Sequence, residues 1–445
     1  MKSNSVSPAR QAAFEILLRV EAGAYASVLL ATKEAELKPH DRALCHELVM
    51  GALRRQLWLD WLIEHYANRK VAELDVAVRV VLRLGLYQLR FLSRVPASAA
   101  VNESVNLVHL AYLRSAGGLV NAVLRRATRE PEVDPTSSIH DPIERVAVAT
   151  SHPSWLIERW TKAFGAAETE EFARANNEPA PVAFRIVNNR AQEGEVYERL
   201  HRSGAELVSS RIVTGAWRIV GGRGLLAESV AAGEVYVQDE ASQLVAVMLG
   251  ARPGERVLDL CAAPGGKTTQ IADQCLDSAI IVASDLHEHR LKTLVSLAKL
   301  QGLRSIHCVA LDGLSALPLA ESSFDRVLVD APCSGTGTLR RNPEIRWRIS
   351  PADIQDLSGR QKQLLFNAAR VVKLGGRLIY STCSVEPEEN EEVVQTFLEN
   401  NKTFRLGQLS LDSSLITSFG AARTWPHRDG TDGFFICAFE RMRWE

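Results

Sequence analysis

The stretch Arg256-Val-Leu-Asp-Leu-Cys-Ala-Ala-Pro-Gly-Gly-Lys-Thr268 decides the fold of the C-terminal half of the chain. Val257, Leu258 and Leu260 form a short apolar run that ends in a glycine-rich turn, and a helical apolar pattern follows from Ile271. This order predicts a buried strand, a tight loop and a helix. Such a loop brings backbone N–H groups and a helix N-terminus to a ligand at the carboxyl edge of a parallel sheet.

The glycine spacing in this loop argues against two common ligands. A phosphate-binding P-loop needs a glycine at the position that Cys261 occupies, five residues before Gly266-Lys-Thr268. A dinucleotide fingerprint needs G-x-G-x-x-G, whereas Gly265 and Gly266 are adjacent. The remaining candidate is S-adenosylmethionine, which needs a backbone cradle for its methionine end and an acid for its ribose.

Two acidic residues follow the next predicted strands and could bind the nucleoside. Asp285 ends the apolar run 280–285 and suits a ribose acceptor, although it could also cap the helix that follows. Asp312 is expected near the adenine amino group, with a turn role as the alternative. The residues predicted to bind the cofactor are Cys261, Ala262, Ala263, Pro264, Gly265, Gly266, Lys267, Asp285, Asp312 and Asp330.

Three motifs resemble, in order, those of the RNA cytosine-C5 methyltransferases of the Sun/Nop2 group. They are Cys261-Ala-Ala-Pro-Gly-Gly-Lys-Thr268, Asp330-Ala-Pro-Cys-Ser-Gly335 and Ser381-Thr-Cys-Ser384. The resemblance implies a Rossmann-like domain that uses S-adenosylmethionine. Alternating strand and helix patterns from residue 238 onward agree with a parallel sheet. Sheets of this type usually close with an antiparallel strand, which is expected at 434–439.

Cytosine C5 is a poor nucleophile because its electrons belong to an aromatic ring. A thiolate that adds to C6 activates C5, so the reaction needs a cysteine, a donor at the N3 edge and a base for the C5 proton. Cys333 and Cys383 both follow predicted buried strands. A single cysteine in such a place would more often be an inert buried thiol. Two cysteines in these contexts favour catalysis, but the residues alone do not identify the nucleophile.

The resemblance implies distinct roles for these residues. RNA-type enzymes of the family use the cysteine of the Thr-Cys motif, which implies Cys383 as the nucleophile. Cys333 would assist proton removal or thiol release, although DNA cytosine methyltransferases use the Pro-Cys cysteine instead. Asp330 is expected to hydrogen-bond the N3 edge of the cytosine. An enzyme that methylates amino groups would more often show an Asp/Asn-Pro-Pro-aromatic motif here.

Residues 1–130 predict an all-helical domain, with apolar residues at helical spacing. It resembles the NusB-type RNA-binding domain in Asp41-Arg42 and in the stretches 82–89, 99–103 and 120–125. The resemblance implies contact with RNA or a ribosomal protein; the alternative is a domain that only packs on the catalytic part. Candidates for RNA contact are Arg125, Arg126, Arg340, Arg341 and Arg346, each of which could instead lie on an ordinary solvated surface.

The remaining chain divides by composition. Residues 131–175 predict a linker and helical bridge, and residues 176–237 predict a small α+β module that the resemblance relates to the RNA-recognition fold. Residues 238–445 form the predicted catalytic domain. The predicted fold is therefore multidomain, with an all-α domain, a small α+β module and an α/β methyltransferase domain.

The composition limits the functional class. The net charge is −1, but residues 1–130 hold 18 Lys and Arg against 12 Asp and Glu, so RNA would be held by patches. Seven scattered cysteines without C-x-x-C pairs predict neither a metal site nor disulfides. No secretory signal or membrane span is evident, so a cytoplasmic monomer that binds no membrane is expected.

The sequence thus predicts S-adenosylmethionine-dependent methylation of a cytosine C5 in RNA. Taken with the helical domain, the resemblance implies 16S rRNA, naked or in an early assembly intermediate, with cytosine 967 as the target. One alternative is the same chemistry on tRNA or another rRNA site. Another is a non-catalytic RNA-binding factor for ribosome assembly. A dehydrogenase is disfavoured because the dinucleotide fingerprint is missing.

Overall fold

The structure is a computed structural model and describes residues 6–442. The chain divides into two compact units. The first extends to Pro179 and also contains Leu339–Arg348; the second comprises Ala180–Thr338 and the chain from Ile349 onward. A short segment from the middle of the C-terminal half therefore folds with the N-terminal unit.

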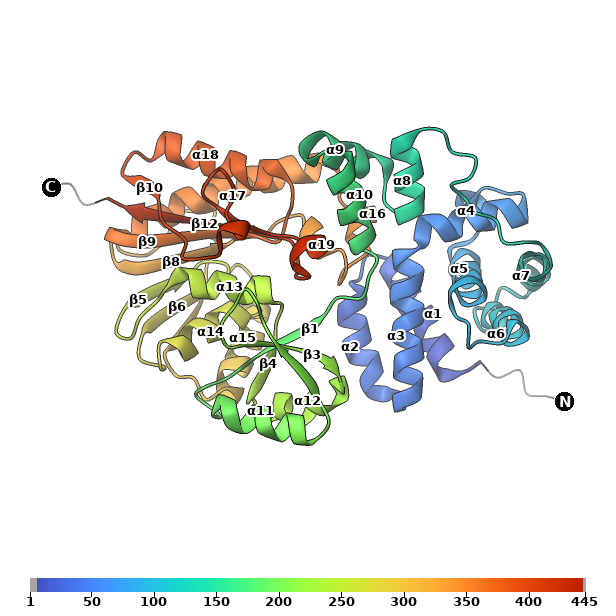
Figure 1. The fold of residues 1–445 in the computed structure, drawn as a ribbon, viewed down its shortest axis with the longest axis horizontal. Helices are drawn as coiled ribbons and strands as arrows, with labels where there is room; N and C mark the ends of the chain where they lie inside the picture. Colours follow the sequence, from blue (N-terminus) through green and yellow to red (C-terminus); the bar gives the residue numbers. More distant parts are fainter. Residues whose placement is uncertain (1–5, 443–445) are drawn as a thin grey trace. The chain divides into compact units, whose positions relative to one another are not determined.

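The first unit is helical, as predicted (Figure 1). Its α-helices are α1 (Pro8–Glu21), α2 (Ala26–Glu36), α3 (Pro39–Arg54), α4 (Gln56–Ala67), α5 (Val76–Phe91), α6 (Ala97–Leu110), α7 (Gly117–Arg129), α8 (Pro142–Thr150), α9 (Ser154–Phe164), α10 (Ala166–Ala175) and α16 (Ile345–Arg348). One continuous apolar core joins α1 to α7.

Helix α5 shows why these residues form this unit. Asp75 caps its first turn by accepting a hydrogen bond from the backbone N–H of Ala77 (2.8 Å). Its apolar residues recur at helical spacing and are buried in the common core. Buried Arg83 forms ion pairs with Asp60 and Glu21, both at 2.6 Å. These pairs satisfy a charge that would otherwise be costly to bury.

The second unit begins with a four-stranded antiparallel sheet in the order β2-β3-β1-β4. Its elements are β1 (Val182–Ile186), α11 (Glu193–Arg202), β2 (Glu206–Ser209), β3 (Ala216–Gly221), α12 (Leu226–Ala231) and β4 (Val235–Val237). This β-α-β-β-α-β arrangement is the ferredoxin-like motif. The predicted small α+β module is confirmed, although the sequence patterns did not identify β2 and β4.

A larger mixed sheet follows, with the order β10-β12-β9-β8-β5-β6-β7 and β11 beside β12. Its elements are α13 (Glu240–Leu249), β5 (Arg256–Asp259), α14 (Gly266–Gln274), β6 (Ile280–Asp285), α15 (Glu288–Leu300), β7 (Ile306–Ala310), β8 (Phe324–Asp330), α17 (Pro351–Val371), β9 (Val372–Thr382), α18 (Glu391–Asn400), β10 (Phe404–Leu406), β11 (Ala422–Thr424), α19 (Pro426–Asp429) and β12 (Phe434–Arg441). Strand β12 is antiparallel to β9, as predicted for the closing strand.

Helices cover both faces of this sheet (Figure 1). Residues alternate between the two faces, so Val257 packs with α13 and α14 while Leu258 packs with α17 and α18. Strands β7, β6, β5, β8 and β9 are parallel. Their carboxyl ends therefore share one edge, where Asp259, Asp285, Asp330 and Thr382 end their strands.

Two observations concern the surface. Within residues 6–442, no helix has the length and apolar character needed to cross a membrane.

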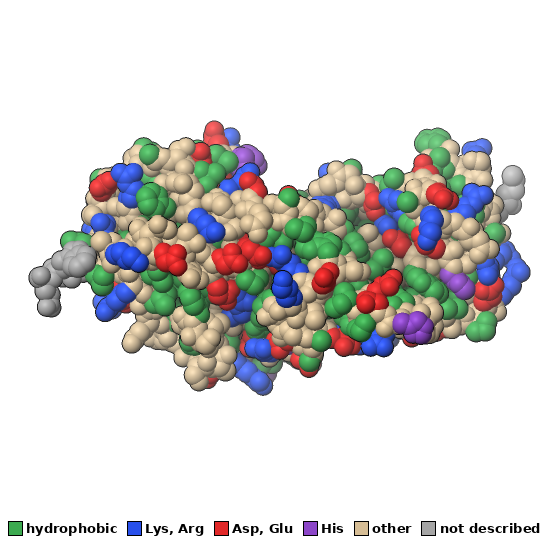
Figure 2. All heavy atoms as spheres, turned by 90° about the horizontal axis from the view of Figure 1, so that it is seen from above, with side chains coloured by type: hydrophobic (Ala, Val, Ile, Leu, Met, Phe, Trp, Pro, Cys, Tyr) green, Lys and Arg blue, Asp and Glu red, His purple; other side chains and the backbone are tan. Residues whose placement is uncertain are grey.

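On the face drawn in Figure 2, Lys and Arg side chains are interspersed with Asp and Glu. A mixed surface of this kind gives no single-sign field over that face.

Candidate active site

A cavity of about 400 Å³ opens at the carboxyl edge of the large sheet. It brings together the ends of three predicted motifs with apolar side chains from neighbouring loops. Its lining includes Leu260, Cys261, Ala263, Asp285, Leu286, His287, Arg290, Leu311, Asp312, Leu314, Asp330, Pro332, Cys333, Leu364 and Cys383. A smaller pocket of about 120 Å³ is lined by the glycine loop with Ala262, Pro264, Gly265, Gly266 and Lys267, and by Asp259 and Asp330.

The glycine loop between β5 and α14 needs glycine at its sharpest turn. Gly265 has φ +112°, and a Cβ atom there would lie 2.6 Å from a side-chain carbon of Leu294. The N–H of Ala262 donates to the carbonyl of Ser284 (2.7 Å), which ties the loop to β6. The loop thereby presents bare backbone beside the cavity.

Beneath the loop, Asp259 is almost fully buried and accepts a hydrogen bond from the Thr268 hydroxyl (2.7 Å). Burial raises the pKa of Asp259 from 3.8 to about 7, despite that hydrogen bond. The ionised carboxylate is therefore unfavourable in the folded chain near neutral pH.

This pKa predicts a pH-dependent stability. Between pH 4 and 7, Asp259 is ionised in the unfolded chain and protonated in the folded one, so the free energy of unfolding falls as pH rises through that window. The full pKa difference corresponds to roughly 4 kcal/mol. Thermal unfolding at pH 5 and pH 8 should show a flatter pH dependence for Asp259→Asn than for the wild type. An equal pH dependence of stability for the two proteins would contradict the raised pKa of Asp259.

The cavity fits S-adenosylmethionine. Asp285 accepts from the N–H of His287 (3.0 Å) and pairs with Arg290 (3.2 Å), while its carboxylate still lines the cavity. Asp312 forms a turn by accepting from Leu314 N–H (3.0 Å), and it lines the same cavity. Asp285 therefore caps the helix that follows it and Asp312 forms a turn, as considered from the sequence. Both residues also line the cavity. The glycine loop of the adjoining smaller pocket suits the methionine end of the cofactor, and the two acidic residues and apolar walls of the cavity suit its ribose and adenine.

The two cysteine motifs meet at this cavity. The Sγ atoms of Cys333 and Cys383 lie 3.4 Å apart, and both residues line it. The hydrogen bond with Cys383, together with burial, raises the pKa of the Cys333 thiol well above its usual value. Cys333 thus stays a thiol that can donate to its neighbour.

Asp330 lies between two donors at the end of β8. It accepts hydrogen bonds from Lys267 Nζ and from the Ser381 hydroxyl, both at 2.7 Å. Burial acts to lower the pKa of Lys267, but the adjacent carboxylate outweighs it and raises that pKa above 10.5. The Lys267 ammonium also lies over the Phe434 ring, 5.2 Å from its centroid. The Lys267–Asp330 ion pair therefore lines the smaller pocket, and Asp330 also lines the cavity.

Sequence reasoning missed several residues around this site. Tyr236 and Gln238, at the end of the ferredoxin-like module, line the smaller pocket with the glycine loop. Arg185 of β1 fixes the module to α14 by donating to the Thr269 hydroxyl (2.9 Å). Tyr236 lies in the middle of β4, a strand of three residues that is too short to show an alternating pattern, so no local signal pointed to it.

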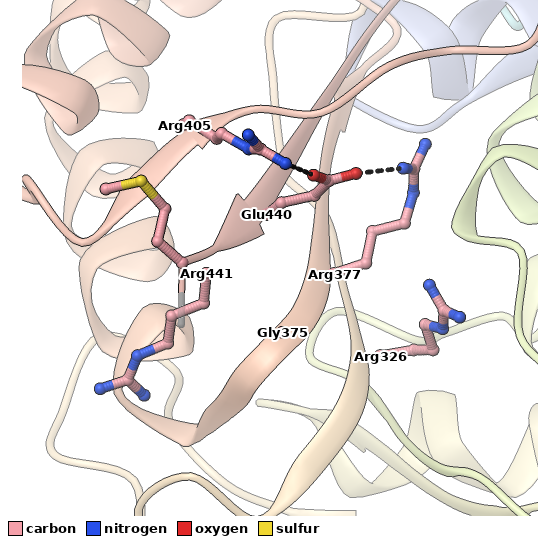
Figure 3. Close-up of a pocket in the computed structure, with 7 residues that line it drawn as sticks. Arg326, Gly375, Arg377, Arg405, Glu440 and Arg441 are labelled. Carbon is pink, nitrogen blue, oxygen red and sulfur yellow. Dashed lines mark hydrogen bonds and ion pairs between the residues drawn. The ribbon is translucent and has the colours of Figure 1, made fainter. Parts of the chain in front are cut away.

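A third pocket, of about 290 Å³, lies at the start of β9 and the end of β12 (Figure 3). Four arginines line it: Arg326, Arg377, Arg405 and Arg441. Figure 3 shows Glu440 between Arg405 and Arg377, paired with them at 3.0 and 3.7 Å. Arg326 pairs with Glu255 (2.9 Å), and Arg441 donates to the carbonyl of Val372 (2.5 Å). These contacts give the arginines structural partners at the sheet edge.

The arginines proposed for RNA contact lie in different environments. Arg125 is exposed on α7, whereas Arg126 donates to Glu130 (2.6 Å) and to the last carbonyls of α4. Arg341 is partly buried. Arg340 and Arg346 are buried, with 4% and 0% of their surface exposed. Burial argues against direct phosphate contact by Arg340 and Arg346, so that prediction is not retained for them.

Arg346 has a structural role in the first unit. Its guanidinium donates to the carbonyl of Ser151 (2.9 Å) and to the side-chain oxygen of Asn177 (3.0 Å). Burial lowers the pKa of Arg346 to about 9, which leaves it charged at neutral pH. The segment 339–348 is fixed further by buried Glu344, which accepts from Ala26 N–H (2.8 Å), and by Arg348, which donates to the carbonyl of Val20 (2.6 Å).

Arg346→Ala should therefore lower stability. The substitution leaves buried acceptors without a donor and creates a void. We therefore expect the free energy of unfolding to fall by roughly 3 kcal/mol. Arg125→Ala, on an exposed surface, should change stability by about 0.5 kcal/mol or less. Thermal unfolding and RNA binding of the folded variants separate the two roles. A stable Arg346→Ala protein that binds RNA weakly would reverse our interpretation.

Comparison with known proteins agrees with this architecture. Three family models match the chain: NusB over residues 7–129, the ferredoxin-like domain of RsmF/B-like methyltransferases over 152–223, and the 16S rRNA methyltransferase RsmB/F over 246–440. A probable ribosomal RNA small subunit methyltransferase B from Bacillus subtilis is 36% identical, covering 99% of this chain and all of that protein.

Solved structures agree as well. The crystal structure of PH0851 aligns with TM-score 0.86 at 30% identity, covering 98% of this chain and 99% of the other. A methyltransferase homologue from Pyrococcus horikoshii aligns with TM-score 0.60 at 27% identity, covering 68% of this chain and all of the other. The chain therefore belongs to the 16S rRNA methyltransferase RsmB/F family, and it is an S-adenosylmethionine-dependent methyltransferase.

Proposed function

We propose that this enzyme methylates C5 of one cytosine in 16S rRNA, at position 967, through a covalent adduct between Cys383 and C6 of the base. The observation that carries the proposal is the pair of thiols 3.4 Å apart beside Asp330, in the cavity that suits S-adenosylmethionine. The Bacillus subtilis relative is a probable ribosomal RNA small subunit methyltransferase B, and the matching family model is a 16S rRNA methyltransferase, which supports the substrate class.

The two cysteines are proposed to act in sequence. Cys383 adds as a thiolate to C6, and the electron pair of the C5–C6 double bond moves into the ring. S-adenosylmethionine supplies the methyl group to the activated C5. A base then removes the C5 proton, and the returning electron pair expels Cys383. The raised pKa of Cys333 supports its role beside the nucleophile, since a thiol 3.4 Å away can donate to the departing Cys383.

The Lys267–Asp330 pair is proposed to stabilise the adduct. Thiolate addition places negative charge on the N3 side of the ring, where a proton is needed. The pair holds a proton between an ammonium and a carboxylate 2.7 Å apart and can deliver it to N3. The target base must leave its stack to reach this cavity.

The helical unit is proposed to hold the RNA. Its resemblance to NusB and the exposed position of Arg125 support this role. Bacterial rRNA is made in the cytoplasm, which is where we propose that the enzyme acts. Its substrate is proposed to be free rRNA or an early small-subunit precursor.

Mapping of the methylated nucleotide tests this function. Deproteinised 16S rRNA, assembled small subunits and bulk tRNA would each be incubated with enzyme and methyl-labelled S-adenosylmethionine, then digested and sequenced by mass spectrometry. A single 5-methylcytosine at position 967 of free 16S rRNA is expected. Label in tRNA, or at another position, would contradict the proposed target. Cofactor binding without transfer to any RNA would favour the non-catalytic assembly factor.

A further inference from the structure

A buried carboxylate lies directly behind the two cysteines. Glu389 is fully buried at the end of a single 3-10 turn, Pro387–Glu389, six residues after Cys383. It accepts hydrogen bonds from the N–H and the hydroxyl of Ser334, the first at 2.9 Å. It also accepts from the Ser384 hydroxyl (2.5 Å) and from Gln361 Nε2 (2.9 Å). All four hydrogen bonds come from uncharged donors, and together they stabilise the buried carboxylate.

These contacts join the two cysteine loops. Ser334 directly follows Cys333, and Ser384 directly follows Cys383. The last paired residues of β8 and β9 are Asp330 and Ser381, so both cysteines lie beyond the ladder that aligns the strands. One carboxylate that accepts from both serines therefore supplies a link that the sheet does not.

Neighbouring contacts make this link rigid. The Gly337 N–H donates to the Cys383 carbonyl (2.9 Å), which connects the loops a second time. A Cβ atom at Gly337 would lie 2.0 Å from the Gly433 carbonyl oxygen, so only glycine permits this approach. The Tyr380 hydroxyl donates to the Glu389 carbonyl (2.6 Å), which fixes the 3-10 turn against β9.

We propose that Glu389 is a positioning residue that sets the separation of the Cys333 and Cys383 thiols. It does not line the cofactor cavity, so it acts through Ser334 and Ser384. The hydrogen bond with Cys383 and burial raise the pKa of Cys333 most, and the negative charge of Glu389 raises it further. The expected effect of Glu389 on catalysis rests on the proposed function, whereas its expected effect on the separation of the thiols is independent of it.

The first test measures thiol geometry without RNA. Diamide, an azo oxidant, takes two electrons and two protons from a pair of thiols and leaves a disulfide and a hydrazine. Wild-type thiols 3.4 Å apart should form the Cys333–Cys383 disulfide readily, detected as a loss of two hydrogens by mass spectrometry and located by peptide mapping. Glu389→Gln replaces an acceptor oxygen with an amide and should slow this reaction about tenfold.

The second test measures methyl transfer. Glu389→Gln should lower kcat about tenfold and leave the KM for S-adenosylmethionine within twofold, because misplacement affects the reacting thiols and spares the cofactor cavity. Ser384→Ala removes one hydroxyl and should lower kcat in the same direction, by a smaller factor. This milder variant keeps the proposal testable where Glu389→Gln folds poorly.

Asp273→Asn provides the matched control. Asp273 is also a buried carboxylate that accepts backbone hydrogen bonds, from Asn188 and Asn189 (3.1 and 2.8 Å), but away from the cysteines. It should leave both the disulfide rate and kcat near wild type. Unchanged rates in Glu389→Gln and Ser384→Ala would overturn the proposal, as would equal losses in Asp273→Asn. Failure of wild-type methyl transfer would refute the proposed function alone, because the disulfide rate still reports on Glu389.

Discussion

Cys383→Ala should reduce methyl transfer to 16S rRNA by about 10⁴-fold or more and abolish the covalent RNA adduct. Without the thiolate there is no addition at C6, and C5 keeps its unreactive aromatic character. Labelled rRNA, cofactor and enzyme, separated on a denaturing gel, would show an adduct as a band of lower mobility. The cofactor affinity should remain within about threefold, because the other cavity residues stay in place.

Cys333→Ala provides the decisive comparison. The covalent adduct between Cys383 and the RNA should persist or accumulate in this variant, because the thiol that helps to release Cys383 is gone. Cys308→Ala, at a thiol on β7 that does not line the cavity, should behave like the wild type. An adduct that vanishes in Cys333→Ala and survives in Cys383→Ala would make Cys333 the nucleophile, as in the DNA enzymes.

Asp330→Asn should lower kcat by about 10²- to 10⁴-fold, the range expected for loss of a positioned proton donor. The substitution keeps the shape of the side chain but removes the charge that raises the pKa of Lys267. Burial then lowers that pKa, and the proton for N3 is no longer held between the two groups. Single-turnover transfer at saturating cofactor measures the effect on the chemical step.

Asp325→Asn is the matched control on the same strand. Asp325 pairs with Lys373 at 2.7 Å, the distance seen for Asp330 and Lys267, but at the opposite end of β8. Its loss should change kcat by less than about twofold. If both substitutions slowed transfer equally, the Asp330 effect would reflect damage to the sheet rather than proton delivery.

Much of this site could be predicted from the sequence because parallel strands end at one edge. Asp285, Asp330 and Cys383 are far apart in the chain, yet the two aspartates end recognisable strands and Cys383 directly follows one. Strand order then brings them around one cavity. The closing strand predicted at 434–439 was confirmed as β12, because its apolar run is long and continuous.

Other features depend on partners that local sequence does not reveal. Arg346 and Trp347 belong to a basic, aromatic stretch typical of an RNA-binding surface, but the acceptors for Arg346 lie about 170 to 195 residues earlier in the chain. Glu389 belongs to the acidic run Glu386-Pro-Glu-Glu-Asn-Glu391, whose composition favours a solvated loop. Only the fold places donors from the loop after β8 and from α17 around it.

The membership of residues 339–348 in the first unit also limits how this enzyme can be divided. No single cut of the gene separates the helical unit from the catalytic unit. A fragment beginning at residue 180 would leave Arg346 and Arg348 without their carbonyl acceptors. A fragment ending at residue 179 would leave Ala26 N–H without its carboxylate acceptor and the Ser151 carbonyl without its donor. Unlike modules joined by a linker, these two units can be exchanged between proteins only if the chain is divided at 179/180, 338/339 and 348/349 together.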